Sequence, residues 1–145
     1  QVFPDELKDA VREAGASLVQ TREATQVCPG FTTTPVLSGR RDEQGLLVEK
    51  SGNATLVTGC AHPGIVKMVR SAGEIAGGAV STVLGGFHMK DSSEKSIRRV
   101  VEELADMGVK RVGPCHCSGN MTRQIMRKTF ADSYLGAHVG KRLPL

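Results

Sequence analysis

The regular alternation of apolar runs and amphipathic stretches from residue 54 onward most constrains what this chain can fold into. Apolar runs at 54–59, 79–87 and 109–114 predict three strands. Apolar residues spaced three and four apart predict helices at 63–72, from about residue 92 to Gly108, and again from Ser118. A further strand is predicted at 133–139. Such an order is typical of βαβ units. We therefore predict the α/β class, with a mixed β-sheet flanked by helices.

The first third of the chain carries weaker patterns. Residues 4–15 predict a helix, and residues 17–37 contain β-rich pieces interrupted by Pro29-Gly30. The apolar runs 46–50 and 54–59 are separated by Ser51-Gly52-Asn53, which predicts a hairpin. With 145 residues and no linker-like segment, residues 1–145 are expected to form a single domain.

Composition narrows the possible partners. Trp is absent and there are only four Phe and one Tyr, so the core must be aliphatic and no aromatic platform is available to stack nucleic-acid bases. The net charge of +4 comes from basic residues scattered along the chain, which argues against a nucleic-acid-binding arm. We expect no nucleic-acid partner.

Cysteine usage and hydropathy bear on location. Four cysteines are too few for a disulfide scaffold, so reduced thiols and a cytoplasmic location are expected. No apolar run is long enough to span a membrane, so no membrane partner is expected. The chain begins at Gln1 rather than at Met, which suggests a processed chain or a fragment.

Three of the four histidines follow predicted strands. His62, His88 and His116 each come just after one of the three apolar runs. The carboxyl ends of parallel strands meet at one edge of a sheet, where sites of α/β proteins are built, so these imidazoles should gather there. The alternative is that each is an ordinary solvated histidine at a strand end. His138 lies inside the last predicted strand and is taken as structural or exposed.

The stretch Cys115-His116-Cys117 admits a more specific interpretation. If it is extended, alternate side chains point in opposite directions, so the two thiols cannot easily share a metal with the imidazole. We therefore interpret His116 as directed at a site and flanked by two packed thiols. Ser118 and Gly119 would begin a helix whose free N–H groups can hold a carboxylate or phosphate. Nearby glycines suit either close approach to a ligand or ordinary strand-to-helix turns.

Four motifs together carry a family resemblance. The segments DEQGLLVEK (42–50), TGCAHPGI (58–65), GGFHM (85–89) and PCHCSG (114–119) resemble the C-terminal half of metallo-β-lactamase-fold hydrolases. The dihydropterin–ribofuranosylaminobenzene phosphate synthase-like branch is especially similar. The resemblance implies half of an αββα sandwich with a binuclear metal site, commonly zinc, in which His62 and His116 bind metals. His88 lies near the position where many members place a bridging Asp, and is a further candidate ligand.

The resemblance also shows what this chain lacks. The family's His-x-His-x-Asp-His segment belongs to the N-terminal half, and nothing like it occurs here. We therefore expect zinc, iron or manganese to be bound weakly or not at all by this chain alone, and we assign it no catalytic residue. A small anionic substrate would require the complementing half.

Three functions remain open at this stage. The chain is half of a metal-dependent hydrolase and inactive by itself, or it is a non-catalytic interaction or regulatory module derived from that fold, or it binds a metal or anion through a trihistidine site of His62, His88 and His116. A half-sandwich would leave apolar sheet surface around Val83 and Val112 uncovered, so a homodimer is also expected.

Overall fold

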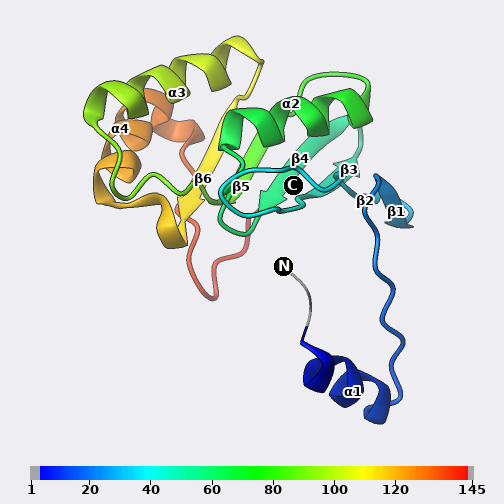
Figure 1. Ribbon diagram of the computed structural model, residues 1–145. Helices are drawn as coiled ribbons and strands as arrows, with labels where there is room; N and C mark the ends of the chain where they lie inside the picture. The colour runs from blue at the N-terminus through cyan, green and yellow to red at the C-terminus, as the bar shows by residue number, and fades with distance from the viewer. Residues whose placement is uncertain (1–3, 144–145) are drawn as a thin grey trace.

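A single six-stranded mixed sheet dominates the fold (Figure 1). The computed structural model describes residues 4–143. The strands lie in chain order across the sheet; β1 to β4 pair antiparallel, whereas β4, β5 and β6 are parallel. Their bounds are β1 Thr25–Cys28, β2 Phe31–Thr33, β3 Leu46–Lys50, β4 Asn53–Thr58, β5 Thr82–Gly86 and β6 Arg111–Cys115. The predicted α/β class with a mixed sheet is confirmed.

Helices follow each of the parallel strands. α2 connects β4 to β5, α3 connects β5 to β6, and α4 follows β6; α3 packs against both α2 and α4. Figure 1 shows α1 standing away from the sheet at the end of a long extended connection, and none of its residues is buried. The helix bounds are α1 Asp5–Glu13, α2 Ile65–Ala76, α3 Glu94–Asp106 and α4 Asn120–Phe130, with short 3-10 helices η1 His116–Ser118 and η2 Ala131–Ser133.

The core is almost entirely aliphatic, as the composition predicted, with Phe87 as a buried aromatic side chain. One row of paired residues crosses four strands and is fully buried: Leu47, Leu56, Val83 and Val112. Helical side chains such as Met68 complete the same cluster. The expectation that Val83 and Val112 would be uncovered is therefore wrong, because both side chains belong to this buried core. The neighbouring row points to the opposite face, since side chains alternate along a strand.

Two helix boundaries differ from those predicted. Gly73 does not end α2; the helix continues to Ala76 and ends at Gly77, whose φ of 63° supplies the left-handed conformation that terminates helices. The last helix begins at Asn120, not Ser118, because residues 116–118 form η1 first.

One predicted strand does not form, and part of the β-rich stretch 17–37 has no regular structure. Residues 133–139 contribute only an isolated bridge between Val112 and Tyr134, and residues 17–20 carry no strand. Leu135 N donates to the Val112 carbonyl at 2.8 Å, but no ladder continues from it. Across residues 4–143, no helix combines the length and the apolar character that a membrane span requires.

Candidate metal centre

The three loops after β4, β5 and β6 meet at one edge of the sheet, and each holds a strained residue. Ala61, His88 and His116 have φ values of 58°, 49° and 47°. Non-glycine residues seldom adopt this left-handed region, and each costs of order 1–3 kcal/mol, a cost met most often at functional sites. The same backbone feature at the ends of three adjacent parallel strands marks this edge as the candidate site.

Glycines let these loops approach one another closely. A Cβ on Gly86 would lie 2.4 Å from the Gly59 carbonyl oxygen and 2.7 Å from Cys117 Sγ. Gly85, with a φ of 124°, would place a Cβ 2.1 Å from the Thr58 carbonyl oxygen. The close approach to a neighbour, rather than turn geometry alone, therefore explains why Gly85-Gly86 ends β5.

Glu43 organises the loop after β4. Its Oε1 accepts hydrogen bonds from the N–H groups of Cys60 at 2.7 Å and Ala61 at 3.0 Å, and its Oε2 accepts from His62 N at 3.0 Å. Burial acts to raise the pKa of Glu43, but the bonds from the His62, Cys60 and Ala61 main chain, and from the His62 ring, outweigh it. The pKa is therefore lower than the ordinary value of 4.5. Glu43 is an anion at neutral pH.

The same carboxylate fixes the His62 ring. Nδ1 of His62 lies 2.8 Å from Glu43 Oε2, and both side chains are mostly buried. Because an ionised carboxylate only accepts hydrogen bonds, Nδ1 carries a proton, and Nε2 is the ring nitrogen left to bind a metal. A carboxylate behind the ring is the usual arrangement for a histidine that binds a metal. The contact between Glu43 and the His62 ring is therefore the one expected of a histidine that binds a metal.

His88 lies beside His62, as predicted. Their ring centroids are 4.5 Å apart, with the ring planes tilted by 51°. His88 is exposed, whereas its neighbour Phe87 is buried. The loop after β5 thus presents an imidazole at the surface beside the anchored one.

His116 lies with two thiols instead. Donor atoms of Cys60, His116 and Cys117 all lie within 4.8 Å of one another, the one such group among residues 4–143. The condition under which the thiols and the imidazole would point apart, an extended backbone at residues 115–117, is not met, because His116 is left-handed and begins η1. This turn brings the imidazole and the Cys117 thiol to the same side.

The two thiols are close enough to influence each other. Burial, then a hydrogen bond and repulsion from Cys117, raise the pKa of the Cys60 thiol above its ordinary value. Cys117 Sγ in turn lies 3.5 Å from the Cys60 carbonyl oxygen and donates to it. Both cysteines are free and half-buried. Without a cation, Cys60 is a neutral thiol at pH 7.

Ser118 and Gly119 occupy structural positions in the loop after β6. Ser118 is buried; its Oγ accepts from the Phe87 N–H at 3.1 Å and donates to the Cys115 carbonyl at 2.7 Å. Gly119, with a φ of 82°, precedes α4, and a Cβ there would lie 2.6 Å from Lys90 Cα. Their predicted role in anion binding stays a prediction.

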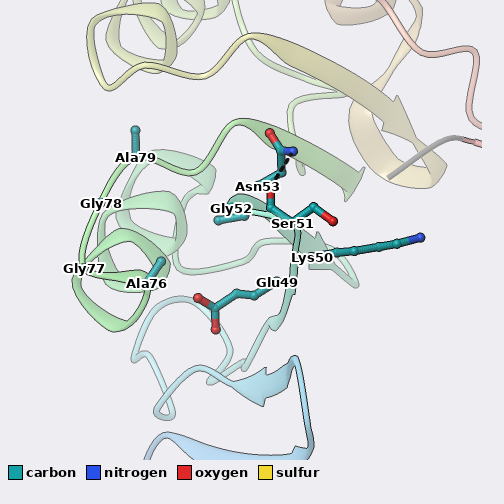
Figure 2. Close-up of a pocket in the computed structure, with 10 residues that line it drawn as sticks. Glu49, Lys50, Ser51, Gly52, Asn53, Ala76, Gly77, Gly78 and Ala79 are labelled. Atoms are coloured by element: carbon teal, nitrogen blue, oxygen red, sulfur yellow. Dashed lines mark hydrogen bonds between the residues drawn. The ribbon is translucent and has the colours of Figure 1, made fainter.

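A hollow of about 460 Å³ lies at the opposite end of the sheet (Figure 2). It is lined by residues 49–54, around the β3–β4 turn, and by residues 76–79, at and after the end of α2, and no histidine or cysteine is among them. Asn53 begins β4 and Ala79 lies shortly before β5, whereas the histidines follow the parallel strands. The hollow is therefore separate from the candidate site.

Sequence reasoning missed two residues of the site. Glu43 is 19 positions from His62, and no periodicity connects them; only its place in the resemblance-bearing segment 42–50 pointed to it. Cys60 was not predicted as a site residue, although its spacing of two from His62 places it in the same loop.

Two relatives match the sequence, while no protein-family model does. The chain is 35% identical over 162 residues to 7,8-dihydropterin-6-methyl-4-(beta-D-ribofuranosyl)-aminobenzene-5'-phosphate synthase of Methanocaldococcus jannaschii, an alignment covering 93% of this chain and 55% of that protein. An uncharacterized protein of the same organism is 29% identical over 86 residues, which cover 59% of this chain and 32% of that one.

A solved structure supports the same family resemblance at the level of the fold. A metal-dependent hydrolase of the beta-lactamase superfamily matches with a TM-score of 0.72 and 26% identity, covering 90% of this chain and 59% of that one. The resemblance to the metallo-β-lactamase fold and to the dihydropterin synthase is confirmed. The chain spans a little over half the length of both proteins.

Proposed function

We propose that this chain forms part of a metal-dependent hydrolase of the metallo-β-lactamase type, and that a complementing N-terminal half supplies the remaining metal ligands. The observation that carries the proposal is the Glu43–His62 pair, in which one carboxylate holds both the ring and the main chain of a histidine. Such an arrangement positions Nε2 of His62 as a ligand. The structural neighbour, a metal-dependent hydrolase, supports the same activity.

The ligands proposed within this chain are His62 and His116, with His88 as a third. All three follow parallel strands at one sheet edge, and His62 and His88 are in ring contact. Zinc, iron and manganese all suit imidazole ligands, and two such ions are proposed by analogy with the family. When bound, such ions act as Lewis acids toward the substrate and lower the pKa of water. Glu43 keeps the His62 ring in the required tautomer.

The isolated chain is proposed to lack hydrolase activity. Among residues 4–143, the one group of three potential donors joins two thiols with His116 and includes no carboxylate. A carboxylate that orients or deprotonates the attacking water would have to come from the other half.

An anionic, phosphate-bearing small molecule is the proposed substrate class. The first turn of α4 contains no acidic residue, so its free N–H groups keep their positive character. Arg123 places its guanidinium 3.2 Å from the His116 carbonyl oxygen, next to the candidate ligands. The name of the synthase relative includes a 5'-phosphate, which supports this class. A cytoplasmic location is proposed from the four free cysteines.

The test joins this chain to the preceding region of the Methanocaldococcus jannaschii synthase. We expect the fused protein to bind zinc, iron or manganese by elemental analysis and to hydrolyse a phosphodiester or ester, whereas the isolated chain does not. His62→Ala should reduce metal content and activity together, and His138→Ala, far along the chain, should change neither. A folded fusion protein that binds no metal would instead support the non-catalytic module.

A further inference from the structure

We propose that Cys60, His116 and Cys117 form a binding site for one thiophilic divalent cation, such as Zn²⁺, complete enough to hold the ion within this chain alone. The proposal goes beyond the hydrolase function. It shares His116 with the centre proposed above, but its other two donors are thiols of this chain, so this site needs no ligand from another segment. It also replaces the expectation that the Cys117 thiol serves only as packing.

The distances suit a single ion. With Zn–S near 2.3 Å and Zn–N near 2.0–2.1 Å, two donors on one tetrahedral zinc lie about 3.5–3.8 Å apart. The three donor atoms already lie within 4.8 Å of one another. Side-chain rotations that move the donor atoms by about 1 Å would therefore bring the cysteines and the histidine to the spacing that one zinc ion requires, without movement of the backbone.

The backbone holds the donors in place from two loops. Glu43 fixes the loop after β4 through the Cys60 N–H at 2.7 Å. His116 adopts its left-handed conformation at the start of η1, and the buried Ser118 ties the same turn to Phe87 at the end of β5. Because both loops are anchored by buried groups, little chain entropy is lost when an ion binds.

The donor set selects the kind of cation. Two thiolates and a neutral imidazole neutralise a divalent ion, and each thiol releases its proton to solvent as it binds. Soft sulfur ligands favour zinc over magnesium, calcium or manganese. Cys60 and Cys117 are half-buried, whereas His116 is exposed. The fourth position therefore faces solvent, as in sites that keep a water or accept a substrate atom.

The test titrates the metal-free, reduced chain with Co²⁺, whose thiolate complexes have a near-ultraviolet charge-transfer band and intense visible bands when tetrahedral. We expect one equivalent to bind with both features, and Zn²⁺ to displace it. Cys60→Ser and Cys117→Ser should each weaken the charge-transfer band and lower affinity by at least about tenfold, the loss that removal of even an outer-shell partner causes. Cys115→Ser is the matched control, since it lies in the same motif outside the group.

A second measurement needs no variant. Zn²⁺ should slow alkylation of Cys60 and Cys117 by iodoacetamide, read by peptide mass spectrometry, and leave the exposed Cys28 unaffected. His116→Ala should abolish the protection, and His62→Ala should not. Cobalt binding without a thiolate band, or equal protection of Cys28, would overturn the proposal. Because these readouts concern thiolates in the isolated chain, their failure would leave the hydrolase function standing.

Discussion

The Glu43 carboxylate binds His62 twice, through the ring Nδ1 at 2.8 Å and through the main-chain N–H at 3.0 Å, both on Oε2. The other oxygen takes the N–H groups of Cys60 and Ala61. One side chain thus accepts hydrogen bonds from three consecutive amide groups and holds the ring of a candidate ligand. The middle residue of the three, Ala61, is the one in the left-handed conformation.

Replacing this carboxylate should weaken the whole fold. In Glu43→Gln the amide NH₂ cannot accept from the N–H groups facing it, so we expect the free energy of unfolding to fall by about 2 kcal/mol or more, as for hydrogen bonds to a charged group. Urea denaturation with EDTA present measures this loss. Glu49→Gln, at an exposed position in β3, is the control and should change stability by less than about 0.5 kcal/mol. Equal effects of the two substitutions would contradict the role given to Glu43.

The difference in free energy of unfolding between the wild type and Glu43→Gln should change with pH in a definite direction. The pKa of Glu43 is lower in the folded protein than in the unfolded chain, where it is ordinarily 4.5. The ionised carboxylate therefore contributes its full stabilisation above the unfolded pKa. That stabilisation is lost as the pH falls through the lower native pKa. The gap in stability between the wild type and Glu43→Gln should therefore narrow as pH is lowered below about 4.5. Denaturation curves at several acidic pH values measure it. A gap that widens on acidification would contradict the assignment.

The regular part of the fold was predictable because its signals are local. The alternation of apolar runs with 3.6-residue periodicity fixed β4, α2, β5, α3 and β6, and the parallel arrangement followed from it. The ends of the elements were harder to predict. The predicted strand at 133–139 does not form because a short apolar run adds no strand unless it finds a continuous partner, and its described contact with β6 is an isolated bridge at Val112.

The site was predictable only in part. Strand ends identified His62 and His88, since periodicity places them at one edge. The thiol group could not be found this way, because His116 departs from extended backbone at one residue, and a single left-handed φ reverses which side chains face each other. The partner of His62 lies in a different loop, and pairings between distant loops depend on tertiary structure.

Gly86 should tolerate no side chain. A Cβ there would meet the Gly59 carbonyl oxygen at 2.4 Å and Cys117 Sγ at 2.7 Å, both in the loops of the site. Gly86→Ala should therefore cost about 1–3 kcal/mol or more, the usual cost of overpacking. Gly78→Ala is the control, because nothing lies within 4 Å of its Cβ position. Thermal unfolding of both variants checks the prediction, and similar melting temperatures would contradict the proposed close approach.

Ser118 should matter for folding rather than for ligand contact. Its Oγ is the acceptor for the Phe87 N–H, and both residues are buried. Ser118→Ala leaves that amide without a partner, at an expected cost of about 1–3 kcal/mol. Ser96→Ala, at an exposed position in α3, should be close to neutral. Chemical denaturation separates the two, and a neutral Ser118→Ala would show that this bond stabilises nothing.

The sheet face opposite the Leu56 row should drive self-association of the isolated chain. On this face a row of paired residues is only half-buried: Leu46 in β3, Val57 in β4 and Leu84 in β5. The next position in the row, Gly113 in β6, is covered by Leu135 and Ala137. Partly exposed apolar rows of this kind favour association, here with a second copy when the complementing half is missing. We expect sedimentation velocity to show a dimer that forms as concentration rises.

A substitution in the middle of that row separates specific association from general stickiness. Val57→Lys places a charge between Leu46 and Leu84 and should shift the equilibrium toward monomer. Leu7→Ser removes an exposed leucine from α1, away from the sheet, and should leave the equilibrium unchanged. A compact wild-type monomer at every concentration, or a dimer that Val57→Lys leaves intact, would show that this face does not form the contact. Fusion to an N-terminal half that covers the row should abolish dimerisation for the same physical reason.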